Sequence, residues 1–263
     1  MTEVVDLEKL LQSARSALDG MRLGSADAAR EMRRVIPDVQ RAADSGNSEF
    51  QELLGGVALE YMKDYETAHY YLLAAAKAGN NSAQRGLAYM LFEGLGVQKN
   101  KGEAVKLFEA AAKAGDRAAK FNLAGVLLRG DGAAKDKNRA ISLLWEASHA
   151  GMDAASRQLG EISLSEGDYD TARQLLTSAV EQGSYRALLN LGIMCRDGLG
   201  GSVDRVKALT CFLRLLDVRD GDGFHEAHAL VLEMTDQEVR EAALKAGRVN
   251  EGDALIKSRG KSS

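Results

Sequence analysis

The sequence predicts an all-α protein, a right-handed solenoid of stacked antiparallel helix pairs. A short motif carries the first observation: A-A-K-A-G at residues 75–79 returns at 111–115 and, altered to A-S-H-A-G, at 147–151, a period of 36 residues each time. A fixed period of this size is typical of helical-repeat proteins. Composition carries the second, because alanine and leucine dominate the apolar residues and aromatics make up only 5%. Both residues favour helix, and strand-like β-branched runs are lacking.

Helical spacing of apolar residues, with cap signals between the segments, predicts the elements in order. We expect helices at about 4–19, 26–45, 48–62, 65–78, 82–93, 101–114, 118–129, 137–150, 154–165, 169–182, 186–197, 204–218, 223–233, 236–246 and 249–257. Gly20 should close the first helix and Ser25 should cap the second, in which Pro37 should cause a kink or a division. Thr235 and Glu238 stand at capping-box spacing.

Five helix pairs between residues 47 and 220 follow one pattern, and each pair needs its neighbours. Both helices of a pair carry a wide apolar face, which only stacking against the next pair can cover. In the first helix of the second to fifth pairs, a small residue follows a leucine and allows the neighbouring helix to approach closely. These small residues are Ala88, Ala124, Gly160 and Gly192. We therefore expect a divergent N-terminal cap (1–46), five repeats (47–220), C-terminal capping helices (221–257) and a disordered tail (258–263).

Charge and composition argue against several classes of protein. The formal net charge is −4, which lacks the basic footprint of a nucleic-acid binder. No apolar run is long enough to span a bilayer, and the N-terminus lacks the pattern of a signal peptide. Two cysteines do not make a disulfide framework. A cytoplasmic protein that binds neither nucleic acid nor membrane is the expectation.

The repeats resemble the Sel-1-like repeats, a branch of the tetratricopeptide superfamily. The resemblance covers about residues 42–220, and the first and fourth units lack the G-x-G turn. It rests on Ala83, Leu87-Ala88, Leu91, Gly94, Gly96-Val97, Ala104, Leu107-Phe108, Ala111-Ala112 and Gly115, and in the fifth unit on Ala187, Leu191-Gly192, Gly198, Gly200, Ala208 and Cys211-Phe212. The resemblance implies adaptor or scaffold work within protein complexes.

The residue before the leucine of each first helix is the most informative position. It is Leu53, Gly86, Asn122, Gln158 and Asn190 in the five units. In similar tetratricopeptide superhelices, asparagines at this place line the concave groove and bond the backbone of an extended peptide. A carboxamide both donates and accepts hydrogen bonds, which suits a peptide unit. Alternatively, these amides are solvated or brace neighbouring helices.

Basic and aromatic residues supply further candidates. Arg85 and Arg157 lie near the starts of first helices and could meet an acidic peptide or a C-terminal carboxylate; otherwise they are solvated charges. Trp145, the single tryptophan, occupies a position that holds Glu109 and Thr177 in other units. This favours partial exposure and a role as an interface anchor, with packing under a neighbouring unit as the alternative.

Other sequence patterns argue against phosphate-binding loops and metal sites. The G-x-G turns follow helices and lack a Gly-Lys-Ser/Thr ending, so they indicate positive φ rather than phosphate binding. Cys195 and Cys211 are expected to be buried, reduced thiols, with a disulfide as the alternative. His225 and His228 are one residue short of the spacing of a zinc hydrolase. Residues 220–223, D-G-D-G, favour a loop over a calcium site.

The sequence therefore predicts a non-enzymatic adaptor without a cofactor or metal, which binds an extended segment of a partner protein or peptide in its concave groove. The candidate groove residues are Asn122, Gln158, Asn190, Arg85 and Arg157. Two alternatives stay open. The chain could regulate an enzyme or transcription factor through its outer surface or C-terminal helices, or it could be an accessory component of an enzyme. The partner and the oligomeric state do not follow from the sequence.

Overall fold

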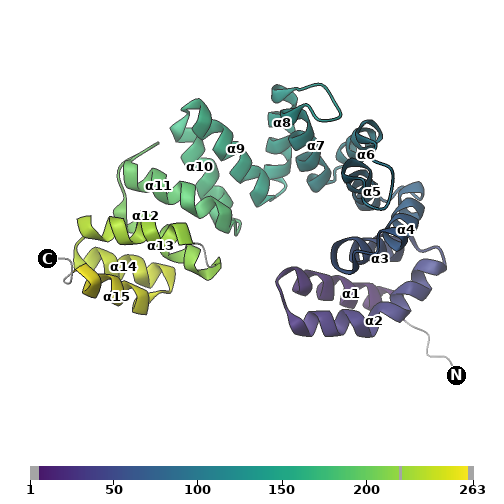
Figure 1. Cartoon of the computed structure of the whole chain (residues 1–263), viewed down its shortest axis with the longest axis horizontal. Helices are drawn as coiled ribbons and strands as arrows, with labels where there is room; N and C mark the ends of the chain where they lie inside the picture. The colour runs from purple at the N-terminus through teal and green to yellow at the C-terminus, as the bar shows by residue number, and fades with distance from the viewer. Residues whose placement is uncertain (1–5, 219–220, 260–263) are drawn as a thin grey trace. The chain divides into compact units, whose positions relative to one another are not determined.

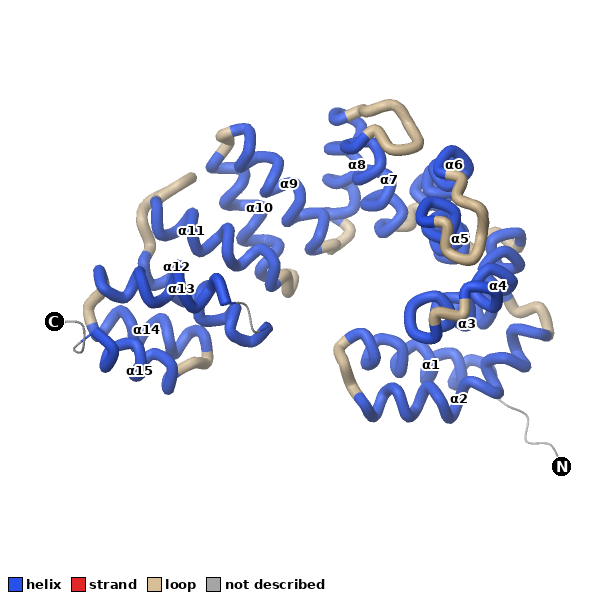
Figure 2. The backbone as a smooth tube through the Cα atoms, viewed as in Figure 1, coloured by secondary structure: helices blue, strands red, loops and turns tan. Residues whose placement is uncertain are grey.

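The computed structural model describes residues 6–218 and 221–259 (Figure 1), and these residues contain helices and loops but no strand (Figure 2). The fifteen α-helices of this part are α1 (Leu7–Arg22), α2 (Ala26–Asp44), α3 (Ser48–Val57), α4 (Tyr65–Lys77), α5 (Asn81–Glu93), α6 (Lys101–Lys113), α7 (Arg117–Arg129), α8 (Lys137–His149), α9 (Asp153–Glu166), α10 (Tyr169–Glu181), α11 (Leu188–Asp197), α12 (Arg205–Leu215), α13 (Gly221–Leu230), α14 (Asp236–Ala246) and α15 (Val249–Arg259). The expected all-α fold of consecutive helix pairs is confirmed.

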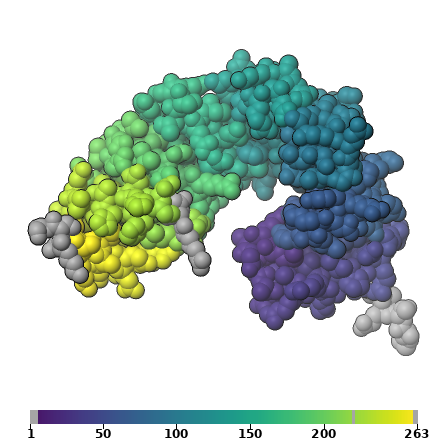
Figure 3. Space-filling model, in the orientation of Figure 1, coloured from purple at the N-terminus to yellow at the C-terminus, as the bar shows by residue number. Residues whose placement is uncertain are grey.

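The chain forms two compact units, residues 1–143 and 144–263. In unit 1, α1 packs on α2, α3 on α4 and α5 on α6, and each pair also contacts the next. Figure 3 shows one face of this unit as a space-filling surface, coloured from purple to teal. In unit 2, α9 packs on α10 and α11 on α12, which in turn contacts α13 and α14.

The junction between one pair and the next explains the period of the sequence. Gly79 ends the α4 segment with φ +86°, and the side chain of Asn80 then accepts a hydrogen bond from the backbone N–H of Ala83, which caps α5. Gly115 and Asp116 repeat this arrangement before α7. Left-handed glycine followed by an Asn or Asp cap is a favourable stop and start for helices.

The G-x-G turns also fit the repeat sterically. A Cβ on Gly96 would lie 2.5 Å from the Cβ of Tyr65, at the start of the preceding α4. A Cβ on Gly200 would lie 2.1 Å from the carbonyl oxygen of Tyr169, at the start of α10. Both glycines have positive φ. The expectation of structural rather than phosphate-binding glycines agrees with these contacts, because each turn packs on the preceding pair.

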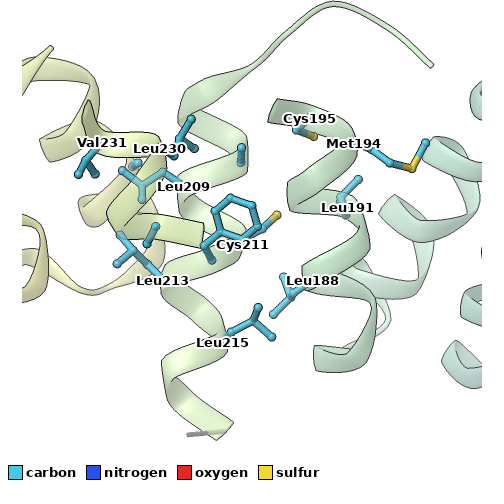
Figure 4. Close-up of a cluster of buried hydrophobic side chains, with 14 of the residues drawn as sticks. Leu188, Leu191, Met194, Cys195, Leu209, Cys211, Leu213, Leu215, Leu230 and Val231 are labelled. Atoms are coloured by element: carbon cyan, nitrogen blue, oxygen red, sulfur yellow. The ribbon is translucent and has the colours of Figure 1, made fainter. Parts of the chain in front are cut away.

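The small residue after the leucine allows close packing, as expected. A Cβ on Gly160 would lie 2.8 Å from Cγ of Leu176, and one on Gly192 would lie 2.4 Å from a ring carbon of Phe212. Phe212 is fully buried. Figure 4 shows that α12 carries apolar residues on two sides, with Leu188 and Leu191 of α11 on one side and Leu230 and Val231 on the other. Each large side chain buried in this way stabilises the fold by about 1.5–3 kcal/mol.

Several local expectations need correction. Gly20 does not close the first helix, since α1 continues to Arg22 and the left-handed glycine is Gly24. Gly20 instead admits α2, because a Cβ there would lie 2.6 Å from the Cβ of Ala28. Pro37 does not divide α2, where Val35 and Val39 are buried on either side of it. The caps at Ser25 and at Thr235 with Glu238 are confirmed.

Further differences lie at helix ends. The helix expected at 48–62 is α-helical only to Val57 and continues as a π-helical turn, η1 (Ala58–Met62). Single 3₁₀ turns replace α-helix at Tyr185–Ala187, Leu216–Val218 and Val231–Glu233. Of the tail expected to be disordered, Ser258 and Arg259 belong to α15, and residues 260–263 lie outside the described part, as do residues 4–5 of the first expected helix.

Candidate partner-binding surface

Unit 1 contains a cavity of about 500 Å³. It lies on the face formed by the first helix of each pair, which is α1, α3, α5 or α7. Its lining comes from α1, α3 with η1, α5 and α7, together with Lys63 after η1, Tyr65 and Leu72 of α4, and the turn after α5. Leu53, Leu72 and Gly86 form part of an apolar surface, while Arg22, Glu60 and Lys63 contribute charge. The cavity is thus an amphipathic recess of the size that small ligands or single side chains occupy.

Two sequence-predicted residues, Arg85 and Asn122, meet in this cavity. The unit-1 members of the predicted column, Leu53, Gly86 and Asn122, all line it. Asn122 is half-buried, and its amide makes no hydrogen bond within the described residues. A carboxamide in this state has both its donors and its acceptor available.

Arg85 is held firmly rather than free. Its Nε donates to Oδ2 of Asp116 at 3.2 Å and one terminal nitrogen donates to Oγ of Ser82 at 2.8 Å. Ser82 in turn donates to Oε1 of Glu52 at 2.8 Å. This chain of bonds joins α3, α5 and the cap of α7. Arg85 therefore braces three helices while its guanidinium lines the cavity.

Two adjacent glycines of α3 differ sharply in their surroundings. A Cβ on Gly55 would lie 2.7 Å from Cγ of Leu72, so this position must stay small for α4 to pack. A Cβ on Gly56 would meet nothing within 4 Å, and Gly56 lines the cavity. Glycine inside a helix costs about 1 kcal/mol relative to alanine. No packing contact explains Gly56, and its effect is to leave the recess open.

Lys63 follows the π-helical turn and has φ +56°, the only positive φ of a non-glycine residue in the described part. Glycine holds the corresponding position after α5, α7, α9 and α11: Gly94, Gly130, Gly167 and Gly198. A left-handed conformation costs such a residue about 1–2 kcal/mol. The Lys63 side chain is exposed, lines the cavity and has no ion-pair partner among the described residues.

The other predicted groove residues belong to unit 2. Gln158 on α9 and Asn190 on α11 are half-buried, and neither amide has a hydrogen-bond partner in the described part. Arg157 pairs with Glu161 one turn further along α9, and its side chain is only 18% exposed. Gln158 and Asn190 occupy the repeat position of Asn122, and Arg157 occupies that of Arg85.

Trp145 on α8 is 37% exposed, in agreement with the partial exposure expected from its repeat position. Its indole lies beside the imidazole of His149, with ring centroids 5.6 Å apart, and Nδ1 of His149 lies 2.8 Å from the carbonyl oxygen of Trp145. The indole is therefore oriented by its own helix and keeps an accessible face.

The cysteines and histidines form no second site. Cys195 and Cys211 are free and buried, on α11 and α12 (Figure 4). Burial raises the pKa of the Cys211 thiol to about 12. It also raises the pKa of Cys195, an effect that the nearby guanidinium of Arg173 partly opposes. Nowhere in residues 6–218 and 221–259 do three His, Cys, Asp or Glu side chains gather as a metal site requires.

Sequence reasoning missed the features that shape the cavity. Gly56 and Tyr89 fall inside the expected helices 48–62 and 82–93, and Lys63 lies between two expected helices, so the helix pattern distinguishes none of the three; all of them line the cavity, and Tyr89 is 46% exposed. Comparison of the repeats could have revealed Lys63, because Lys63-Asp64-Tyr65 aligns with Gly167-Asp168-Tyr169. The contribution of Arg22 from the N-terminal cap gave no sequence signal.

No helix of the described part is long and apolar enough to cross a membrane.

Solved structures similar to this chain share its helical-repeat fold. A Sel1 repeat protein from Oxalobacter formigenes matches with a TM-score of 0.66 and 29% identity, over 74% of this chain and 58% of that one. The protective antigen c5321 of uropathogenic Escherichia coli, which displays an SLR fold, matches with a TM-score of 0.72 and 24% identity, over 97% of this chain and 56% of that one. The second likeness concerns the fold alone.

Among curated proteins, the rat DAP3-binding cell death enhancer 1 is 35% identical over 81 residues, which is 30% of this chain and 16% of that protein. The mouse protein of the same name is 38% identical over 80 residues. The chain thus matches about a sixth of the length of these relatives. The Sel1 repeat family itself matches at residues 53–80, 81–116, 117–152, 156–184 and 186–216, more than half of the chain. This protein belongs to the Sel1 repeat family and carries five such repeats.

Proposed function

We propose that the chain is a non-enzymatic adaptor that binds an extended segment of a partner protein along the face of its first helices. Sel1 repeats generally mediate protein interactions and are typically non-catalytic. The observation that carries the proposal is the unit-1 cavity, which opens on this face and brings Arg85 and Asn122 together. Arg85 contributes a positive charge to the lining of the cavity, and its hydrogen bond to Asp116 holds the side chain in place.

The form of the ligand follows from the amides. Asn122, Gln158 and Asn190 recur at one repeat position, and none has a hydrogen-bond partner in the described part of the chain. An extended peptide presents one N–H and one C=O per residue, which a side-chain amide can satisfy together. Arg157 precedes Gln158 in the sequence, and Trp145 supplies an aromatic anchor. The name of the rat and mouse relatives, which describes binding to DAP3, is compatible with a protein-binding role.

Replacement of the three amides by alanine tests the proposal. The variant Asn122→Ala, Gln158→Ala, Asn190→Ala should retain its far-UV circular dichroism but lose most of the partner recovered by affinity capture and mass spectrometry. A matched control replaces three exposed amides on other helices, Asn138, Gln174 and Gln237. Equal recovery by the native chain and the first variant would contradict binding through these amides.

A second function has one observation in its favour. Large apolar side chains are exposed in the C-terminal segment, including Leu244 of α14 at 72% and Leu232, in the 3₁₀ turn between α13 and α14, at 63%. Exposed apolar side chains mark a protein-binding surface when they form one patch. In this alternative the chain regulates an enzyme or transcription factor through α13–α15. Leu244→Lys would then abolish capture of the partner, whereas the triple amide variant would behave as the native chain.

A further inference from the structure

We propose that the unit-1 cavity recognises a peptide in which an apolar side chain stands next to a carboxylate. The recess beside Gly56 takes the apolar side chain, and Lys63 pairs with the carboxylate. This inference rests on the proposed function, since it names the chemistry of the segment bound there. Two residues that are unfavourable for local stability lead to this inference, and both line the same cavity: Gly56 and Lys63.

The first of these residues is Gly56, which keeps space open in the middle of a helix. Its neighbour Gly55 is required by Leu72, whereas a Cβ on Gly56 would meet no atom within 4 Å. Leu53 and Leu59, three residues before and after Gly56, give the lining an apolar part beside the charged Glu52 and Glu60. An apolar side chain of a ligand would be removed from water there, which is favourable in proportion to the area it buries.

The second of these residues is Lys63, a strained lysine where the other repeats use glycine. Strained conformations of this kind persist when the surrounding structure holds them, and they gather at functional sites. The preceding π-helical turn, η1, is also a feature that recurs at functional sites. A glycine would remove the strain but also the ammonium group. Retention of lysine is explained if that ammonium group has a ligand.

Charge decides which group Lys63 receives. The cavity's other cations are already paired: Arg22 with Glu60 at 3.4 Å, and Arg85 with Asp116 at 3.2 Å. Lys63 is the lining cation that has no ion-pair partner in the described part. Both lining carboxylates have partners of their own, since Glu52 accepts the Ser82 hydroxyl and Glu60 pairs with Arg22. Neither forms an ion pair with Lys63 in the described part, and a carboxylate of the ligand complements its ammonium group.

The probe is a synthetic heptapeptide library in a Gly-Ser background, in which two neighbouring positions carry every pair of residues. Immobilised full-length chain should retain peptides that combine Leu, Ile, Met or Phe with Asp or Glu. Lys63→Gly should abolish the acidic preference and weaken binding about fivefold, yet raise the melting temperature. Lys63→Glu should invert the preference, so that Lys and Arg replace Asp and Glu.

Gly56→Leu tests the recess, and Gly102→Leu is its control because Gly102 lies exposed in the first turn of α6, away from the cavity. Gly56→Leu should lose retention of all selected peptides, while Gly102→Leu should match the native chain. An acidic preference that survives Lys63→Gly, or peptides retained equally by Gly56→Leu, overturns the inference. Retention of peptides without any apolar-acidic selection also overturns it but leaves the proposed function standing. The triple amide variant tests that function separately.

Discussion

The adjacent glycines Gly55 and Gly56 should respond in opposite directions to the same substitution. Each Gly→Ala change gains about 1 kcal/mol of helix propensity. At Gly56 nothing opposes this gain, because the new methyl group meets no atom within 4 Å. We expect Gly56→Ala to stabilise the chain by about 1 kcal/mol, which corresponds to a rise in melting temperature of about 2–4 °C.

At Gly55 the methyl group would lie 2.7 Å from Cγ and 3.2 Å from the backbone nitrogen of Leu72, a residue that is 2% exposed. Relief of such overpacking costs about 1–3 kcal/mol, so the net effect is a loss of up to about 2 kcal/mol. Urea denaturation followed by far-UV circular dichroism measures both variants. If the two substitutions shift the midpoint in the same direction, the contrast between a packed and an open glycine is wrong.

Three further predictions concern packing, titration and capping. Gly192→Ala should destabilise the fold by up to about 2 kcal/mol in urea denaturation, because its Cβ would strike the buried ring of Phe212 and the cost of overpacking exceeds the gain in helix propensity. Burial raises the pKa of Cys211 from 9.0 to about 12, so the folded chain retains a proton that the unfolded chain loses; this contribution to stability is complete below pH 9 and is lost as the pH rises toward 12. Native chain should therefore lose more stability between pH 8 and pH 10 than Cys211→Ala, and an equal loss in both would contradict the shift. Asp116→Ala should cost about 0.5–2 kcal/mol through loss of the α7 cap, measured by urea denaturation. Asp116→Asn should restore the cap and recover most of that loss, but leave Arg85 without its carboxylate; a cost as large as that of alanine would contradict a capping role.

The helices are predicted well from the sequence because each repeat contains its own signals for the end of one helix and the start of the next. Residues such as Gly79 and Asn80 combine a left-handed stop with a side-chain cap, and both signals are local. Expectations were wrong where tertiary packing overrides a local signal. Gly20 continues a helix because α2 packs against it. Of the two effects expected of Pro37, a kink or a division, the division does not occur, since α2 runs through this residue.

The candidate site was predictable only in part. Repeat alignment drew attention to Arg85 and Asn122, which do line one cavity. The cavity itself depends on an absent side chain at Gly56 and on Arg22 from the N-terminal cap, and neither follows a repeat pattern. Lys63 differs from its aligned glycines, but its left-handed conformation becomes visible only in three dimensions. Departures from the repeat therefore carry more information about function than the repeat itself.

Site-specific photo-crosslinking tests most directly whether the unit-1 cavity is a partner-binding site. The photoreactive residue p-benzoylphenylalanine replaces Tyr89, which lines the cavity, or Tyr70 on α4, which is 66% exposed and lies outside it. We predict adducts with the captured partner from position 89, little from position 70, and loss of the adducts when Gly56→Leu is added. Adducts from position 70 alone, or adducts from position 89 that persist in the Gly56→Leu chain, would contradict the account.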